Sequence, residues 1–159
     1  MTRPAPETDI SLKVSRTINA SRRRVFDAWT QPEMLQKWWG VQESFTVPVA
    51  EVDLRTGGKY RLGMQDPSQS VPYVCYGVYR EVDPPAKLVF TWTLEKMPGD
   101  DSDFVPAETL VTVEFIERGD ATEVVLTHER FTDEPMRDEH QGGWSGCLDN
   151  LDRLFASSS

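Results

Sequence analysis

Two histidines are the residues of this chain whose type most directly suggests chemistry. His128 and His140 titrate near neutral pH, so either imidazole could act as a general base. Neither lies in a G-x-S-x-G or H-E-x-x-H pattern, and no group of ligands has the spacing of a metal site. The pattern therefore favours histidines that are hydrogen-bonded within the fold, with ligand contact and catalysis as the two alternatives.

Large aromatic side chains form the second group of candidates. Small-molecule sites are mostly apolar with a few polar groups, so these rings suit the wall of a cavity, although aromatic residues also simply fill cores. Gly77 can mark a bulge that changes the face of Tyr76. We predict no catalytic residue, no metal and no cofactor, and a ligand-binding set of Trp38, Trp39, Tyr60, Met64, Tyr76, Trp92, His128, His140, Trp144 and Leu148. Lys59 or Arg61 at the rim could hold one carboxylate.

A long C-terminal helix is predicted over residues 133–157. Thr132 or Asp133 can cap its start, and its apolar residues recur every three or four positions, which places them on one stripe. Within it, Gly142-Gly143 indicates either a kink or open space beside Trp144. The stripe consists of Trp144, Cys147, Leu148, Leu151, Leu154 and Phe155.

The rest of the chain is predicted to supply the wall that this helix packs against. Ser21 caps a first short helix, and a T-x-x-E pattern from Thr30 to Glu33 predicts a capping box for a second helix that ends at Gly40. Alternating apolar residues joined by short turns predict an antiparallel meander with one buried face. The predicted strands are residues 10–18, 45–54, 59–64, 73–82, 87–92, 109–116 and 122–131.

Composition restricts the function classes. The 159 residues suit one domain over 9–157 behind a predicted disordered tail at 1–8, and residues 98–103 are predicted to form a flexible acidic loop. A net charge of −9 disfavours nucleic acids and anionic membrane surfaces. The N-terminus has no apolar signal region, and no apolar run is long enough to span a bilayer. Cys75 and Cys147 are predicted to be buried thiols in a reducing cytoplasm.

Several stretches together resemble a known family. They are similar to single-domain proteins related to the C-terminal domain of the activator of the ninety-kilodalton heat-shock chaperone ATPase, within the START-like or SRPBCC superfamily. The similarity covers roughly residues 9–156. It is carried by Val25-Phe26-Asp27-Ala28-Trp29 with Pro32-Glu33, Trp38-Trp39-Gly40, the segment from Asp53 to Tyr60 with Gly57-Gly58, the segment from Gly77 to Trp92, Leu126-Thr127-His128-Glu129, and Gly143-Trp144 followed by Leu148, Leu151 and Leu154.

The resemblance implies an α+β helix-grip fold. In it, a curved antiparallel sheet of about six or seven strands wraps a long C-terminal helix, with two short helices after the first strand. It also implies a cavity between sheet and helix that opens near the short helices. The chaperone activator has an additional N-terminal domain for which this chain has no room, so a co-chaperone function is not expected.

Three functions remain in competition. The favoured one is a cytoplasmic protein that binds a hydrophobic or aromatic small molecule, with no nucleic-acid or membrane partner and with a homodimer as one of the assemblies left open. The second is a cyclase- or hydratase-type enzyme that uses the same cavity, and it would need a buried polar cluster beside His128 or His140. The third is a chaperone- or protein-interaction module, which would show an exposed apolar patch away from the cavity.

Overall fold

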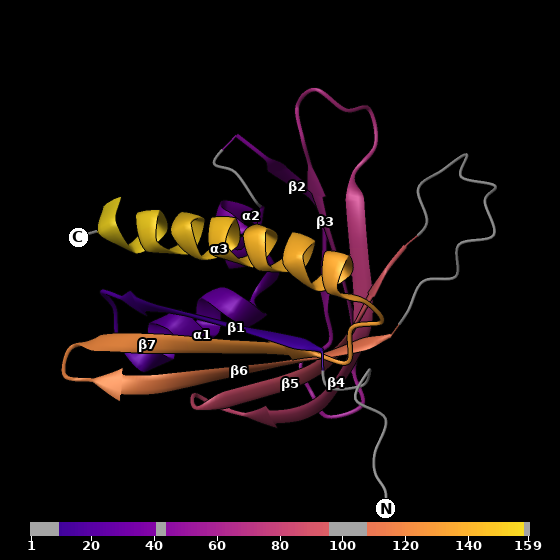
Figure 1. The fold of residues 1–159 in the computed structure, drawn as a ribbon. Helices are drawn as coiled ribbons and strands as arrows, with labels where there is room; N and C mark the ends of the chain where they lie inside the picture. Colours follow the sequence, from indigo (N-terminus) through magenta and orange to yellow (C-terminus); the bar gives the residue numbers. More distant parts are fainter. Residues whose placement is uncertain (1–9, 41–43, 96–107, 158–159) are drawn as a thin grey trace, which may run out of the picture.

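Seven antiparallel strands form one curved sheet, and a long helix lies across its concave side (Figure 1). The computed structural model describes residues 10–40, 44–95 and 108–157, so the tail predicted at 1–8 and the loop predicted at 98–103 lie outside the described residues. The elements are β1 (Ser11–Ile18), α1 (Arg22–Thr30), α2 (Pro32–Trp38), β2 (Thr46–Val52), β3 (Lys59–Gln65), β4 (Tyr73–Asp83), β5 (Lys87–Leu94), β6 (Thr109–Arg118), β7 (Ala121–Glu129) and α3 (Glu134–Ser157).

The strand order confirms the predicted meander and the helix-grip arrangement. From β2 to β7, each strand pairs with the next one along the chain, and β1 pairs with β7 from Ser11↔Glu129 to Ile18↔Thr122. The sheet order is therefore β1-β7-β6-β5-β4-β3-β2. The helices α1 and α2 connect the two edge strands β1 and β2, and α3 lies over β1 with α2 beside it (Figure 1).

Alternate positions of the central strands face α3, although Thr91 and Thr93 between those positions of β5 are buried as well. On β5, Leu88, Phe90 and Trp92 are buried, as the sequence pattern predicts for one face of a strand. The next two strands repeat this pattern, and their inward side chains join those of α3 in one core. They are Thr109, Val111, Val113 and Phe115 on β6 and Thr122, Val124, Leu126 and His128 on β7.

The helix ends confirm two of the three predicted caps. Ser21 accepts a hydrogen bond from the backbone N–H of Arg24, and Asp133 Oδ1 accepts one from Met136 N at 2.8 Å. The capping box at Thr30 is wrong, because Thr30 is the last residue of α1 and its hydroxyl donates back to the carbonyl of Phe26. Local hydrogen bonding within α1 thus satisfies the hydroxyl that a capping box would have used.

Both cysteines are free and buried, as predicted. Cys75 lies on β4 and Cys147 on α3. Burial raises the pKa of the Cys147 thiol to about 12, so both side chains act as small apolar groups. None of the described helices is both long and apolar enough to cross a membrane.

Candidate functional site

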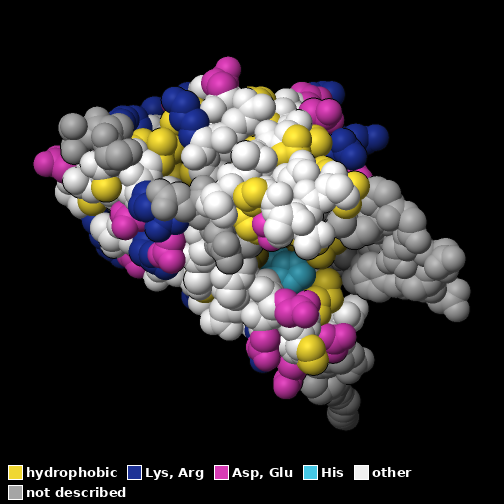
Figure 2. All heavy atoms as spheres, turned by 90° about the horizontal axis from the view of Figure 1, so that it is seen from above, with side chains coloured by type: hydrophobic (Ala, Val, Ile, Leu, Met, Phe, Trp, Pro, Cys, Tyr) yellow, Lys and Arg dark blue, Asp and Glu magenta, His cyan; other side chains and the backbone are white. Residues whose placement is uncertain are grey.

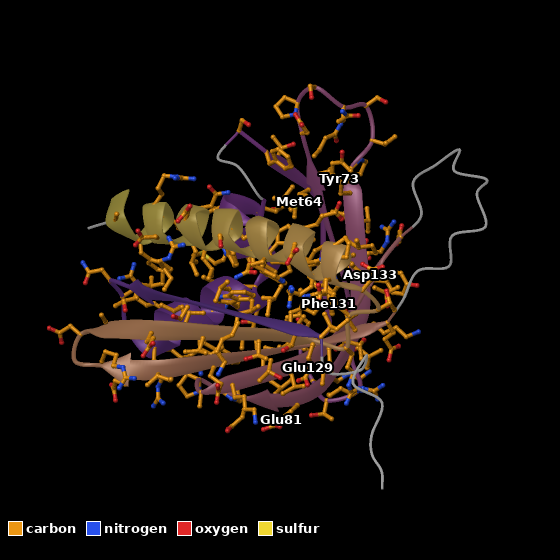
Figure 3. All side chains as sticks on the ribbon, in the orientation of Figure 1. Met64, Tyr73, Glu81, Glu129, Phe131 and Asp133 are labelled. Atoms are coloured by element: carbon orange, nitrogen blue, oxygen red, sulfur yellow. The ribbon has the colours of Figure 1, made fainter. Side chains whose placement is uncertain are left out.

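A hollow of about 440 Å³ separates the N-terminal half of α3 from the ends of β3, β4 and β5. We call it the α3 cleft. Figure 3 shows Met64 and Tyr73 on β3 and β4 beside this half of the helix, with Glu81 on the opposite side of the sheet. The lining residues are Trp39, Phe45, Met64, Asp66, Tyr73, Trp92, Leu94, Glu139, His140, Gly143, Trp144 and Cys147.

Three indole rings from three different parts of the chain meet at the α3 cleft. Trp39 follows α2, Trp92 lies on β5 and Trp144 on α3. The ring centroids of Trp92 and Trp144 are 5.0 Å apart, and Trp39 lies 6.0 Å from Trp92 and 5.6 Å from Trp144. These separations are those of tilted and edge-to-face aromatic pairs, so the rings support one another while presenting apolar surface to the cleft.

A chain of hydrogen bonds fixes Trp144 from behind. Its indole N–H donates to His128 Nδ1 at 3.0 Å, and His128 Nε2 lies 2.7 Å from the hydroxyl of Thr109. Because an indole nitrogen can only donate, Nδ1 of His128 carries no proton and Nε2 carries the single one. Nε2–H therefore donates to Thr109, whose hydroxyl donates in turn to the carbonyl of Trp92 at 3.0 Å. This chain joins α3 to β5, β6 and β7.

A second indole–imidazole pair fixes Trp92. Its N–H donates to His140 Nε2 at 3.2 Å, and His140 Nδ1 lies 2.9 Å from the carbonyl oxygen of Met136, one turn earlier on α3. The same argument places the proton of His140 on Nδ1, from which it is donated to Met136. Figure 2 shows one histidine, in cyan, at the bottom of a hollow with acidic side chains beside it. This is His140, since His128 is fully buried.

Both imidazoles are held in the neutral form. Burial, together with the neighbouring His140, lowers the pKa of His128 to about 2, and burial also lowers the pKa of His140. All four ring nitrogens take part in hydrogen bonds within the protein. Each histidine is therefore arranged to position a tryptophan, and proton transfer to a ligand would first require one of these bonds to break.

No metal centre is visible in the described part of the chain. Within residues 10–40, 44–95 and 108–157, no three His, Cys, Asp or Glu side chains are grouped so that they could hold an ion. The α3 cleft offers aromatic rings, one thioether, one imidazole and two carboxylates. These groups suit binding of an organic molecule by burial and stacking better than they suit metal coordination.

The structure brings five of the ten predicted site residues together at the α3 cleft: Trp39, Met64, Trp92, His140 and Trp144. Three others lie in the surrounding core. Trp38 is buried with its N–H donated to the carbonyl of Ala28, Leu148 is fully buried, and His128 lies behind Trp144.

Tyr60 and Tyr76 are placed away from the α3 cleft. A Cβ at Gly77 would lie 2.0 Å from the carbonyl oxygen of Thr91, and the buried hydroxyl of Tyr60 donates to that same oxygen at 2.6 Å. Tyr60 therefore connects β3 to β5 at the point where only glycine fits on β4. Tyr76 precedes this glycine, has the opposite parity to Cys75, and is 42% exposed on the outer face of the sheet.

The expectation that Lys59 or Arg61 lies at the rim is wrong. Both line a different groove of about 470 Å³, together with Tyr76, Thr93 and Glu95. There Arg61 makes two hydrogen bonds to the carboxylate of Glu95, at 2.7 and 3.1 Å. Side chains alternate between the two faces of a strand, and Arg61 and Met64 occupy positions of opposite parity on β3. They therefore lie on different faces of the sheet. A third hollow, of about 520 Å³, lies between α2 and the end of α3 and includes Lys37 and Arg153.

Seven residues that line the α3 cleft were not in the predicted set. Strand parity could have identified two of them, because Tyr73 shares the face of Cys75 and Leu94 shares the face of Trp92. Gly143 stood out in the sequence as a helical glycine beside Trp144. Thr109, which completes the hydrogen-bond chain behind Trp144, was also missed. The other four lining residues that were not predicted are Phe45, Asp66, Glu139 and Cys147.

Comparison with known proteins adds evidence that is independent of this geometry. The sequence profile of the family described as Activator of Hsp90 ATPase homolog 1-like protein matches residues 19–156. The AHSA1 protein from Silicibacter pomeroyi is 25% identical, with a TM-score of 0.79 over 94% of this chain and 100% of that chain. A protein from Chromobacterium violaceum is 23% identical, with a TM-score of 0.78 over 91% of this chain and 96% of that chain. None of the curated proteins compared with the chain matches it.

Proposed function

This chain belongs to the family of Activator of Hsp90 ATPase homolog 1-like proteins, and we propose that it binds an apolar or aromatic small molecule in the α3 cleft. The observation that carries this proposal is the group of three tryptophans at a hollow of about 440 Å³, within the size range of small-molecule sites. The net charge of −9 further supports a small molecule over a nucleic acid as the partner.

The hydrogen bonds behind the rings support binding by a site that exists before the ligand arrives. Trp92 and Trp144 are each fixed by an imidazole, so their orientation does not depend on a ligand. A preorganised wall avoids the entropy cost of ordering side chains on binding. We therefore expect micromolar affinity for a modest aromatic ligand, which corresponds to about −8 kcal/mol.

A buried polar cluster does lie beside His128, as the enzyme alternative requires. Its members are Thr109, His128, His140 and the two indole N–H groups, and each histidine uses both ring nitrogens within the protein. A general base needs a nitrogen free to accept a proton from the substrate. For this reason we favour binding over catalysis.

Two tyrosines on β4 provide a matched test. Tyr73 and Tyr76 are 44% and 42% exposed, but Tyr73 lines the α3 cleft and Tyr76 lines the groove on the outer face. The experiment titrates the protein with a panel of neutral aromatic and acyl compounds and follows tryptophan fluorescence and melting temperature. We expect binding that Tyr73→Ala weakens several-fold and Tyr76→Ala leaves unchanged.

The opposite results would reject the proposal. If no compound changes either signal, the α3 cleft does not bind this class of molecule. If Tyr76→Ala weakens binding and Tyr73→Ala does not, the ligand occupies the outer groove instead.

A further inference from the structure

The charged residues of the α3 cleft carry one sign. Of its twelve lining residues, two are charged, and both are acidic: Asp66 follows β3 and Glu139 lies on α3. They belong to two different elements that border the same hollow. His140 adds no positive charge there, because burial lowers its pKa and keeps it neutral. In the described part of the chain, no lysine or arginine lines this hollow.

Two arginines on the elements that border the α3 cleft have anionic partners outside it. Arg61 pairs with Glu95 on the outer face of the sheet. On α3 itself, Arg137 pairs with Asp138 and also donates to the carbonyl of Ser11 on β1. Among the described residues that line the α3 cleft, none is basic, so no lining residue neutralises its two carboxylates.

The walls of the α3 cleft contain two further features that favour a particular ligand chemistry. The faces of indole rings attract cations, and tryptophan does so best among the aromatic side chains. In addition, the buried indole N–H groups of Trp29 and Trp39 have no hydrogen-bond partner among the described residues, and of these two residues only Trp39 lines the α3 cleft. A buried donor without an acceptor is unfavourable, so an acceptor atom on a ligand that reaches the N–H of Trp39 would add affinity.

We propose that the α3 cleft selects ligands with a protonated amine attached to an aromatic or apolar body, over neutral and anionic ligands with the same body. The inference rests on the proposed binding function and adds the charge of the ligand to it. Asp66 and Glu139 attract the ammonium group at the mouth, and the three tryptophans hold the body. A hydroxyl, ether or carbonyl oxygen on that body could accept from the N–H of Trp39, which has no partner among the described residues.

The test uses three probes with one naphthalene body: 2-(1-naphthyl)ethylammonium, 2-(1-naphthyl)ethanol and 1-naphthylacetate. Calorimetric titration at about 20 mM salt should give affinities in the order ammonium, alcohol, carboxylate, with steps of about three- to tenfold. At about 300 mM salt these steps should shrink, because exposed charges are then screened.

Variants separate the two carboxylates from the net charge of the protein. Asp66→Asn combined with Glu139→Gln should remove the preference for the ammonium probe, so that the ammonium and alcohol probes bind this variant with equal affinity. Asparagine can still accept the hydrogen bonds that Asp66 Oδ1 receives from Ser68 N and Oγ, so the turn is retained. Asp120→Asn is the control, because Asp120 is exposed in the turn between β6 and β7.

The outcomes distinguish this inference from the function on which it rests. Equal or tighter binding of the alcohol than of the ammonium probe overturns the charge selection and leaves the binding proposal standing. An equal loss of preference in Asp120→Asn also overturns it, since net charge would then explain the effect. If none of the three probes binds and the neutral panel also fails, the binding function is rejected together with this inference.

Discussion

The two halves of α3 use one apolar stripe in different ways. In the C-terminal half, Leu148 and Leu151 are fully buried and Phe155 is 4% exposed, so this half is packed into the core. In the N-terminal half, the stripe meets the α3 cleft, and Trp144 lines this cleft while its ring packs against Trp39 and Trp92. There, the indole N–H groups of Trp144 and Trp92 donate to His128 and His140, and these bonds fix the orientation of the two rings. In the C-terminal half, the buried amide of Asn150 donates instead to the carbonyl of Gly40, away from the α3 cleft. The polar contacts of the N-terminal half thus orient rings at the cleft, and those of the C-terminal half do not.

The largest effect in this comparison should come from Trp144→Ala. The side chain is 3% exposed, and its loss removes ring contacts and leaves His128 Nδ1 without a donor. We expect the free energy of unfolding to fall by about 3–5 kcal/mol, measured by urea denaturation with circular dichroism. Trp144→Phe keeps a ring but not the N–H, so it should cost about 1–3 kcal/mol. Equal losses in the two variants would show that the bond to His128 does not contribute.

A smaller stability loss, with no effect on ligand affinity, is expected for Leu151→Ala. Leu151 is fully buried in the packed half, so truncation should cost about 2–5 kcal/mol. Met64→Ala should have the opposite effect and weaken ligand binding more than it weakens folding, because Met64 is half-buried at the α3 cleft. Parallel denaturation and titration of both variants test this. If Leu151→Ala changes ligand affinity while the protein is still folded, the two halves are not independent.

The pH dependence of stability should contain a contribution that can be assigned to the buried His128. The pKa of His128 is about 2 in the folded protein and about 6.5 in an unfolded chain. The unfolded state therefore binds the extra proton first as pH falls, and stability decreases below about pH 6.5. From about pH 7.5 to about pH 5.5 this histidine alone should remove about 1.4 kcal/mol.

The control for this prediction is His128→Gln. Its amide can accept from Trp144 and donate to Thr109, but it does not titrate. The variant should lose less stability than the wild type over the same pH range, by about 1.4 kcal/mol. An identical pH dependence in both proteins would show that His128 does not carry this effect.

Period and parity are local properties, so the sequence was sufficient to predict the antiparallel meander and the helix that covers it, and the family resemblance implied the helix-grip fold. Alternation of Leu88, Phe90 and Trp92 predicted the inward face of β5, and the spacing of Trp144, Leu148 and Leu151 predicted the buried stripe of α3. The predicted strand boundaries differ from the observed ones by at most two residues at either end. Thr30 is an exception: its hydroxyl donates to a carbonyl within α1 and does not form the predicted capping box.

The candidate site was harder to predict, because it depends on position along an element and on distant pairs. Tyr60 and Met64 share a face of β3 but lie at different points along it. The buried hydroxyl of Tyr60 donates to the carbonyl of Thr91, whereas Met64 lines the α3 cleft. Trp38 and Trp39 are neighbours, and only Trp39, just beyond the end of α2, lines the α3 cleft. The pairing of Trp92 with His140 spans 48 residues, and no local pattern indicates it.

The smallest effect concerns Gly142 and Gly143, two glycines within the N-terminal half of α3. A Cβ at Gly142 would meet nothing within 4 Å, so Gly142→Ala should stabilise α3 by about 1 kcal/mol, the usual difference between the two residues in a helix. Ligand affinity should not change, because Gly142 does not line the α3 cleft. Gly143 does line it, so Gly143→Ala should weaken binding of the same ligand. Melting curves and titrations of the two variants give the answer. Equal affinities would mean that the backbone of α3 at Gly143 is not in contact with the ligand, and the bound molecule would then lie nearer to Met64 and Tyr73.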